Sequence, residues 1–513
     1  MHCGQKILIL DCGSQYTPLI ARRVRELNVY SEVAPWDIPL EKAQAFGPAG
    51  IILSGGPQSV FESGAPSPDP GVLGMGVPVL GICYGMQWMA HELAGKVAAS
   101  SRREYGAAEF LPDLSCPIFA GLQSKEPIWM SHGDRVEALP RGFVSAGRTE
   151  SSPHAAMADL ERSFYGIQFH PEVSHTLRGK EILRHFLYDV CGAVGDWNSG
   201  SFVEEAVAQL RATVGNERVL CAVSGGVDSS VMALLVSRAI GDRAELLFID
   251  HGLLRKDEAS QVEELFGRKF HLKLSAIKAG ARFFEALRGV TDPEEKRKAV
   301  GRAFIEVFEE AARSLGRIPF LAQGTIYPDR IESASASRTA KVIKSHHNVG
   351  GLPEKMNMRV VEPLRDLFKD EVRQVGRLLG LDEEFVARQP FPGPGLAVRI
   401  VGEVTEADVK LLQEADAIFT GEIREAGLYD AVAQAFAVLL PVRTVGVMGD
   451  SRTYERVIAL RAVTTSDFMT ADWFRFDPAF LARVSSRIVN EVKGVNRVVY
   501  DVTSKPPGTI EWE

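Results

Sequence analysis

The feature that most constrains the fold is a seven-residue loop between a strand pattern and a helix pattern. Residues 218–223 form a short, mostly apolar run, as expected of a parallel strand that is covered on both faces. The loop consists of Ser224, Gly225, Gly226, Val227, Asp228, Ser229 and Ser230. Its glycines let the backbone approach an anion closely, and the helix pattern that continues over residues 231–236 directs free N–H groups toward that anion. The pattern predicts a phosphate-binding loop at a strand end.

The loop lacks the Gly-Lys-Ser/Thr ending of the common P-loop, which holds a nucleotide while its terminal phosphate is transferred. A cradle without that lysine suits pyrophosphate as a leaving group, with Asp228 available to share a magnesium ion. The alternative is an ordinary turn rich in serine and glycine. The motif resembles the PP-loop of the ATP pyrophosphatase family, whose members adenylate a carbonyl or carboxyl oxygen. The resemblance implies a Rossmann-like domain that binds ATP through residues 224–230.

Length and composition narrow the classes of function. A chain of 513 residues predicts roughly three domains. The net charge of −8, without a long Lys/Arg run, argues against non-specific binding of nucleic acid or of an anionic membrane. The six cysteines form no C-x-x-C pair, so neither a zinc site nor a disulfide framework is expected. Without a signal-peptide pattern or a long apolar run, the expected location is the cytoplasm.

The first two hundred residues alternate between short apolar runs and helical patterns. The apolar runs 6–10, 50–53 and 77–82 each end in a turn that contains glycine, and residues 17–27 form one of the helical patterns between them. Alternation of this kind predicts a parallel sheet with helices on its faces.

The third apolar run leads into Gly81-Ile82-Cys83-Tyr84-Gly85, which is followed by the helical stretch 86–93. A strand, a sharp turn with glycines around a nucleophile, and a helix form the nucleophile-elbow arrangement, here with sulfur in place of oxygen. The helix N-terminus favours the thiolate form of Cys83. A packed core cysteine is the alternative at this point.

A second segment supplies the partners that a cysteine nucleophile needs. Residues 164–172 read as a strand that ends in His170 and Glu172. Residues at positions i and i+2 of an extended chain face the same side, and Pro171 keeps the chain extended. His170 is therefore a candidate base for Cys83, with Glu172 orienting it. A polar strand end in a loop is the alternative.

The segment 53–57 places two glycines at a strand end, where backbone N–H groups can face a developing oxyanion. Together these elements resemble the class I glutamine amidotransferases over about residues 5–190. The resemblance implies that Cys83 is the nucleophile, His170 the base and Glu172 the orienting residue. Cys12 departs from the family pattern, in which a phenylalanine is expected, and we interpret it as a packing substitution.

The same resemblance assigns the groups around the nucleophile. It implies an oxyanion hole formed by the backbone of Gly56 and Tyr84. It also implies a glutamine-binding site that includes Gln87, Ser131 and His132.

Beyond these residues, the chain shows a linker and more parallel strands. The stretch 192–201 is rich in glycine and serine and suits a linker. The runs 246–252 and 320–325 read as strands with polar carboxyl ends, where ligands bind in open α/β sheets. A glutaminase that releases ammonia and a domain that adenylates an acceptor form a chemically coherent pair.

The C-terminal third is less informative by itself. Residues 389–396 are rich in proline and glycine, as at a domain boundary, and residues 443–450 and 497–513 add strands, basic groups and a Pro-rich tail. Solvated surface charge is an adequate alternative explanation for these residues.

The chain as a whole resembles the family of glutamine-hydrolysing GMP synthetases. This resemblance implies that Arg399, Lys505 and Glu511 contact xanthosine monophosphate (XMP), and that the segment 341–353, with Lys344, forms a lid over the adenylation site. It further implies a homodimer formed through the C-terminal domain.

We therefore expect an α/β chain of three domains. Residues 1–195 are expected to form a class I amidotransferase domain with a parallel-rich sheet, and residues 196–388 a Rossmann-like PP-loop domain. Residues 389–513 are expected to form a smaller α+β domain for dimerisation and XMP binding.

The expected reaction, by resemblance, is that of a ligase: glutamine-dependent amination of XMP to GMP, with ATP and Mg²⁺ and with release of AMP and pyrophosphate. This is the last step of guanine nucleotide biosynthesis. The alternatives are another PP-loop amide-forming ligase, a PP-loop protein that modifies tRNA, and a silent regulatory homologue. The glutaminase motifs argue against the first, the acidic composition against the second, and the presence of every reactive residue against the third.

Overall fold

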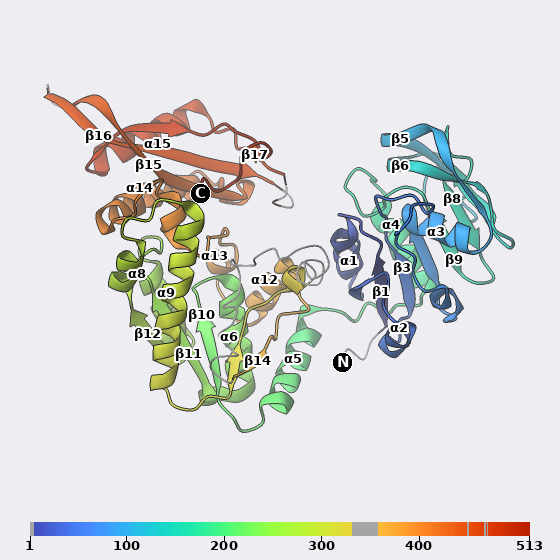
Figure 1. Ribbon diagram of the computed structural model, residues 1–513, viewed down its shortest axis with the longest axis horizontal. Coiled ribbons are helices and arrows are strands. Elements are labelled where there is room, and N and C mark those ends of the chain that lie inside the picture. The colour runs from blue at the N-terminus through green and yellow to red at the C-terminus, as the bar shows by residue number, and fades with distance from the viewer. Residues whose placement is uncertain (1–4, 331–357, 449–450, 466–467, 469) are drawn as a thin grey trace. The chain divides into compact units, whose positions relative to one another are not determined.

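The structure is a computed structural model that describes residues 5–330, 358–448, 451–465, 468 and 470–513 (Figure 1). It contains two compact units, Met1–Phe202 and Val203–Glu513. The predicted lid segment 341–353, including Lys344, lies outside the described residues. The three predicted domain boundaries stay predictions. None of the described helices is long and apolar enough to span a membrane.

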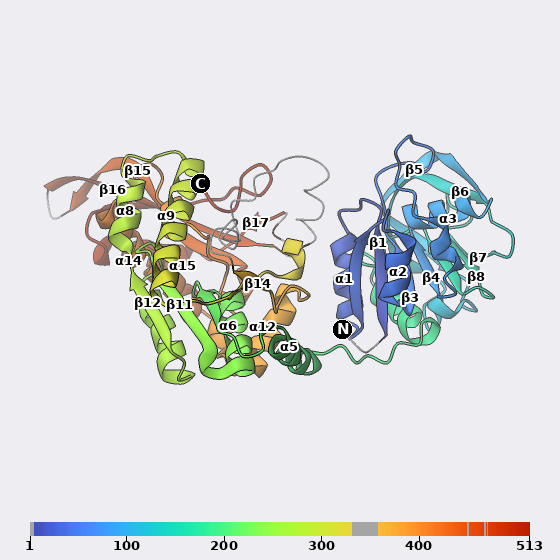
Figure 2. The same ribbon diagram turned by 60° about the horizontal axis from the view of Figure 1, so that its bottom comes forward.

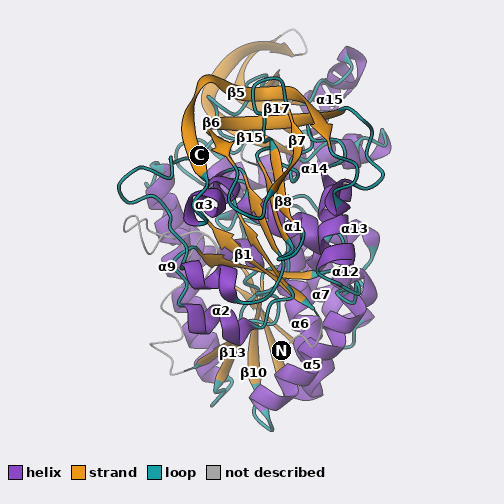
Figure 3. Ribbon diagram, turned by 90° about the vertical axis from the view of Figure 1, so that its right-hand side faces the viewer, coloured by secondary structure: helices purple, strands orange, loops and turns teal. Residues whose placement is uncertain are grey.

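The first unit is built on a nine-stranded sheet with the order β2-β1-β3-β4-β9-β8-β7-β5-β6. Its strands are β1 (Lys6–Asp11), β2 (Tyr30–Pro35), β3 (Gly50–Leu53), β4 (Val79–Ile82), β5 (Lys96–Pro112), β6 (Glu126–Ala138), β7 (Val144–Arg148), β8 (Ala156–Asp159) and β9 (Phe164–Ile167). The neighbouring strands β2, β1, β3, β4 and β9 pair in parallel. The other neighbouring strands of the sheet pair antiparallel. The predicted parallel-rich sheet is thereby confirmed. The long strands β5 and β6 curve away from the parallel strands (Figure 3).

Successive side chains of a strand point to opposite faces of the sheet, and in the parallel strands the side chains on both faces are apolar. Helices therefore cover both faces of this part of the sheet. The helices are α1 (Thr17–Arg25), α2 (Leu40–Phe46), α3 (Tyr84–Glu92) and α4 (Gly179–Arg184), which continues as a π-helical turn over His185–Val190. Met86 and Met89 of α3 and Ala43 of α2 share a core with Leu8 and Leu53. The parallel strand ends that carry the elbow are thus held by buried apolar contacts.

The predicted linker packs on the first unit through Trp197, among other contacts. Trp197 is buried, its backbone N–H donates to the Asn28 carbonyl at 3.0 Å, and its ring packs edge-on against the Tyr30 ring with a centroid distance of 4.9 Å. Helix α5 (Ser199–Val214) follows and runs across the division between the units.

The second unit contains a five-stranded parallel sheet with the order β12-β11-β10-β13-β14. Its strands are β10 (Val219–Val223), β11 (Ala244–Asp250), β12 (Leu274–Lys278), β13 (Phe320–Ala322) and β14 (Arg359–Val361). The helices around it are α6 (Val227–Ile240), α7 (Glu258–Glu263), α8 (Gly280–Leu287), α9 (Pro293–Ser314), α12 (Lys369–Leu378) and α13 (Glu383–Val386).

These helices divide between the two faces of the sheet, as in a doubly wound fold (Figure 2). Leu220 and Leu247 share a core with Phe283 of α8 and Val307 of α9. Helices α6 and α12 pack against each other and α6 contacts β10, so they cover the opposite face. The predicted Rossmann-like arrangement is confirmed.

The C-terminal part of this unit is a small α+β layer, which contains the ribbons labelled α14, α15, β15, β16 and β17 in Figure 1. Strands β15 (Gln434–Met448) and β16 (Ser451–Thr464) form a long antiparallel pair, which β17 (Asp472–Trp473) and β18 (Val495–Tyr500) extend. Helices α14 (Glu406–Glu425) and α15 (Pro478–Glu491) pack on one face of it. A single apolar core continues from the parallel sheet into this layer.

Gly85 offers a test of how tightly the elbow packs on β3. A Cβ atom at Gly85 would lie 2.6 Å from Leu53 Cβ and would also overlap the Leu53 carbonyl oxygen. Because backbone cannot move aside cheaply, we expect Gly85→Ala to lower the free energy of unfolding by about 2 kcal/mol, measured by denaturant titration. Gly74→Ala is the control, since nothing lies within 4 Å of its Cβ position. Equal stability of the two variants would contradict the packing described here.

Candidate active sites

Cys83 lies at the turn between β4 and α3 in a backbone conformation that few side chains adopt. Its φ is 51° and its ψ is −104°, and its N–H donates to the Ile167 carbonyl at 2.7 Å. A Cβ atom at Gly81 would lie 2.7 Å from the backbone of both Gly85 and Met86. Glycine is therefore required before the cysteine as well as after it. Backbone strain of this kind at a nucleophile elbow is typical of functional turns.

His170 and Glu172 form a buried pair directly beside the cysteine. His170 Nδ1 lies 2.7 Å from Glu172 Oε1. Strand β9 ends at Ile167, so both residues lie in the following loop and not on the strand where we expected them. The two-residue spacing nevertheless brings them together. A Cβ atom at Gly55 would lie 3.1 Å from His170 Cε1 and 3.7 Å from Cys83 Cβ, so that this glycine lines the space next to both side chains.

The electrostatics of the pair favour a protonated imidazole. Burial by itself lowers the pKa of His170, but the Glu172 carboxylate and the Cys83 sulfur outweigh burial and raise that pKa to about 11. An imidazole with a raised pKa binds a proton strongly, so it readily takes the proton of the neighbouring thiol, as a nucleophile–base–orienter set requires.

The predicted oxyanion residues lie against each other. A Cβ atom at Gly56 would lie 2.6 Å from the Cys12 carbonyl oxygen and 3.2 Å from Tyr84 Cγ. Tyr84 is fixed in turn by its hydroxyl, which donates to the Pro66 carbonyl at 2.5 Å. Cys12 is fully buried, and burial raises the pKa of its thiol, so that it stays protonated and serves packing. Gly56 and Tyr84 are therefore neighbours, and the oxyanion hole formed by their backbone N–H groups stays a prediction.

The predicted glutamine-binding residues also converge on this place. Cys83 Sγ lies 3.6 Å from the Ser131 carbonyl oxygen. Gln87 Nε2 donates to the Asp134 carbonyl at 2.8 Å, and His132 Nδ1 lies 2.9 Å from the same oxygen. The segment 131–134 is thus held against both the nucleophile and helix α3.

Glu104 is a residue of this site that sequence reasoning missed. It lies opposite His132 in the β5–β6 register, and its Oε2 is 2.9 Å from His132 Nε2. It also accepts hydrogen bonds from Thr149, Ser151 and Ser152. No local pattern marks Glu104, because its partners belong to other strands.

The phosphate-binding loop has the predicted position between β10 and α6. Gly225 has a φ of +82°, and a Cβ atom there would lie 2.9 Å from Val262 of α7. The Ser229 hydroxyl lies 3.0 Å from the Ser224 hydroxyl and accepts from the Ser224 N–H at 3.1 Å. Ser230 is buried and donates to the Gly226 carbonyl at 2.8 Å. The hydroxyls thereby close the loop into a cradle whose exposed rim includes Ser224 and Gly226.

Asp228 lies in the first turn of α6, next to this cradle. Lys369 Nζ is 3.9 Å from Asp228 Oδ2. A carboxylate oxygen beside a phosphate cradle has the chemistry that Mg²⁺ prefers. Among the described residues no cluster of three or more His, Cys, Asp or Glu side chains forms a metal site that is independent of a ligand.

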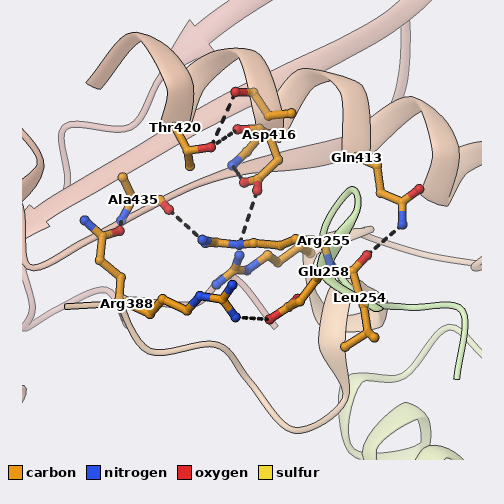
Figure 4. A network of polar contacts seen from close by, with 12 residues as sticks. Leu254, Arg255, Glu258, Arg388, Gln413, Asp416, Thr420 and Ala435 are labelled. Atoms are coloured by element: carbon orange, nitrogen blue, oxygen red, sulfur yellow. Dashed lines mark hydrogen bonds and ion pairs between the residues drawn. The ribbon is translucent and has the colours of Figure 1, made fainter. Parts of the chain in front are cut away.

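A charge network connects the phosphate loop to the C-terminal layer (Figure 4). Arg388 Nη1 donates to the Gly225 carbonyl at 3.4 Å and lies 3.9 Å from Glu258 Oε1. Arg255 precedes Glu258 by three residues, and its Nε lies 3.3 Å from Asp416 Oδ2 of α14. Burial raises the pKa of Glu258, opposed by Arg388. The start of α7 is therefore linked to the phosphate loop through Arg388 and to α14 through Arg255.

In the C-terminal layer, two of the three predicted nucleotide contacts meet. Arg399 is fully buried. Its Nε donates to Glu511 Oε2 at 3.1 Å, and its Nη2 donates to Glu511 Oε1 at 2.9 Å. Gln434, which sequence reasoning missed, donates to Glu511 Oε1 at 2.8 Å. The third, Lys505, donates from Nζ to the Phe468 carbonyl at 2.8 Å. The predicted lid residue Lys344 lies outside the described residues.

Comparisons with known proteins extend these observations over the chain. The family model described as glutamine amidotransferase class-I matches residues 8–190, and the GMP synthase C terminal domain matches residues 421–512. The GMP synthase [glutamine-hydrolyzing] of Thermomicrobium roseum is 59% identical over 99% of this chain and 96% of its own length. The chain belongs to the glutamine-hydrolysing GMP synthase family.

A second curated relative agrees with this membership. The GMP synthase [glutamine-hydrolyzing] of Aquifex aeolicus is 56% identical over 99% of both chains. Among solved structures, a glutamine amidotransferase from Thermotoga maritima, 18% identical, covers 37% of this chain and all of its own, with a TM-score of 0.31. The predicted family is confirmed, and with it the class I amidotransferase fold of the first unit.

The His170–Glu172 pair makes a pH-dependent contribution to stability. Folding raises the pKa of His170 from 6.5 to about 11, so that the contribution is fully present below pH 6.5 and is lost as the pH rises through 11. We expect Glu172→Gln to lower the free energy of unfolding most near pH 6.5 and progressively less toward pH 11, measured by denaturant titration. Glu161→Gln, at an exposed position, is the control. A loss that did not change with pH would contradict this electrostatic coupling.

Proposed function

We propose that this chain makes GMP from XMP, with glutamine as the nitrogen donor and ATP as the activating substrate. One observation carries the proposal: a cysteine–histidine–glutamate set and a lysine-free phosphate cradle occur together in a chain that is 59% identical to a GMP synthase over 99% of its length. The first produces ammonia, and the second makes an acceptor carbon electrophilic.

In the glutaminase half, the Cys83 thiol gives its proton to His170 while the sulfur attacks the side-chain amide carbon of glutamine. Backbone N–H groups at Gly56 and Tyr84 stabilise the oxyanion. His170 then gives the proton to the departing nitrogen, the C–N bond breaks, and ammonia leaves. Water hydrolyses the thioester to glutamate and restores the thiol. Glu172 holds the imidazole and stabilises its charge, while Gln87, Ser131 and His132 shape the glutamine site.

In the synthetase half, residues 224–230 bind the phosphates of ATP. The C2 oxygen of XMP attacks the α-phosphate, and pyrophosphate leaves. Ammonia then attacks C2, AMP leaves with the oxygen, and GMP results. Asp228 would hold Mg²⁺, which supplies charge neutralisation for the phosphates when it is bound. Lys344 would add positive charge from the predicted lid.

The XMP site that we propose lies in the C-terminal layer. Lys505 and Glu511 contact the nucleotide, and the fully buried Arg399 acts by orienting the Glu511 carboxylate. The functional modules are residues 1–195, 196–388 and 389–513. The free cysteines among the described residues fit a reducing compartment, and we place the reaction in the cytoplasm.

The test uses Cys83→Ala in the full chain. We expect the variant to lose GMP synthesis from glutamine and to retain synthesis from added ammonia, because only the first nitrogen source needs the thiolate. Product analysis by chromatography, with XMP in one reaction and inosine monophosphate in a parallel one, also identifies the acceptor. Loss of the ammonia-dependent reaction in a folded variant, or amination of inosine monophosphate, would contradict the proposal.

We also propose that the C-terminal layer forms a homodimer. Val445, Val447 and Tyr454 on the β15–β16 ribbon are 51%, 74% and 57% exposed, which is unusual for a cluster of apolar residues on a soluble surface. We expect Val447→Asp to convert a dimer into a monomer in light scattering. Val144→Asp, at a position on β7 that is 56% exposed, is the matched control and should leave the dimer unchanged. A monomeric unsubstituted chain would refute this part of the proposal.

A further inference from the structure

The Cys83 sulfur has a buried neighbour that neither the motif nor the roles described above use. Gln168 is fully buried, and its Nε2 lies 3.6 Å from Cys83 Sγ, within hydrogen-bonding distance for sulfur. It precedes His170 by two residues, so the same spacing that pairs His170 with Glu172 turns Gln168 toward the nucleophile. Its own backbone is held by a hydrogen bond of 2.8 Å from its N–H to the Ala155 carbonyl.

The direction of the Gln168 amide follows from its neighbours. The Asp134 carbonyl can only accept, so the atom of Gln87 that lies 2.8 Å from it is the amide nitrogen. That nitrogen also lies 3.3 Å from the Gln168 amide, which therefore turns its oxygen toward Gln87. The other end of the Gln168 amide, which faces the sulfur, is consequently the N–H₂ group. A chain of two amides thus presents a donor to Cys83.

The far end of this chain is fixed across the β5–β6 pair. His132 Nδ1 lies 2.9 Å from the same Asp134 carbonyl, and Glu104 holds His132 Nε2 at 2.9 Å. Glu104 is itself anchored by hydroxyl donors from the loop after β7, including Thr149 at 3.0 Å. The Asp134 carbonyl that orients Gln87 is therefore fixed from a second side.

We propose that Gln168 is a further catalytic residue of the glutaminase site and donates a hydrogen bond to the Cys83 sulfur whenever that sulfur is an anion. The inference rests on the proposed glutaminase reaction and adds a group to it. When His170 takes the thiol proton, the sulfur becomes negative and the Gln168 N–H stabilises it, without itself transferring a proton. The same donor stabilises the sulfur when the C–S bond of the thioester breaks, before His170 returns the proton.

Several charged and titratable groups surround the Cys83 sulfur, and a test of Gln168 has to leave them unchanged. His170 and Glu172 lie on one side, and His132 lies behind the amide chain. The ring of Tyr16 lies 5.4 Å from the His170 ring, Tyr84 follows the cysteine directly, and the Glu104 carboxylate lies 2.9 Å from His132 Nε2. Substitution at Gln168 alters none of these groups, so a change in thiolate formation reports the lost donor.

The experiment compares Gln168→Leu and Gln168→Met with the unsubstituted full chain. Both side chains have a similar volume and lack the donor. A hydrogen bond to a charged group contributes enough that we expect kcat for glutamate release to fall roughly 10- to 100-fold. KM for glutamine should change little, and GMP synthesis from ammonia should be unchanged. The pH of half-maximal alkylation of Cys83 by iodoacetamide should rise by about one unit, with Cys83→Ala giving the background.

Phe169→Leu is the structural control. Phe169 is the next residue, is fully buried, and packs on the Phe110 ring at 4.8 Å without facing the sulfur. It should lower the melting temperature and leave the alkylation midpoint in place. If Gln168→Leu and Gln168→Met keep the midpoint of the unsubstituted chain, the proposal is wrong, even where glutamate release falls. If one of them fails to fold, the alkylation profile of the other decides.

The two readouts separate this inference from the proposed function. Alkylation of Cys83 needs neither glutamine, ATP nor XMP. An unsubstituted chain that releases no glutamate would overturn the proposed glutaminase reaction. A midpoint that is unchanged in a chain that does release glutamate would overturn only the role of Gln168.

Discussion

Backbone packs directly on backbone where helix α3 starts, and the geometry of the cysteine site depends on that contact. Gly85 donates its N–H to the Ser54 carbonyl at 3.1 Å, and a Cβ atom at Gly85 would overlap Leu53. Because the helix start and the end of β3 approach this closely, Cys83 is forced into its unusual turn and lies next to Gly55. The loop that carries His170 follows β9 directly and places the imidazole beside the sulfur.

In the second unit, charged side chains help to hold the phosphate loop in place. Its phosphate loop also follows a parallel strand, where backbone N–H groups and a helix N-terminus are available to an anion. The loop backbone is exposed to ligand on one side, so its other side has to be supported. Val262 packs under Gly225, and Arg388 binds the Gly225 carbonyl while facing Glu258. Arg255, just before α7, contacts Asp416 of α14, so the segment that supports the phosphate loop also contacts the C-terminal layer.

Reasoning from sequence succeeded where the determinants are local. The strands that precede both loops, and the helices that follow them, were predicted because apolar runs and glycine turns are properties of neighbouring residues. The pairing of His170 with Glu172 followed from their two-residue spacing, although β9 ends earlier than predicted. That spacing also applies to Gln168, which was overlooked because an amide is a weaker chemical signal than a histidine or a carboxylate.

By itself, the sequence determined which chemical groups this protein carries and the turns that expose them, since glycine positions and strand patterns act over a few residues. Which distant groups support them depends on the tertiary structure. Glu104 meets His132 through the β5–β6 register, Arg388 reaches Gly225 across 163 residues, and Arg399 reaches Glu511 across 112. These pairs depend on strand register and on the packing of α7 and α14. Both arise from the whole core at once, and for that reason no short segment contains them.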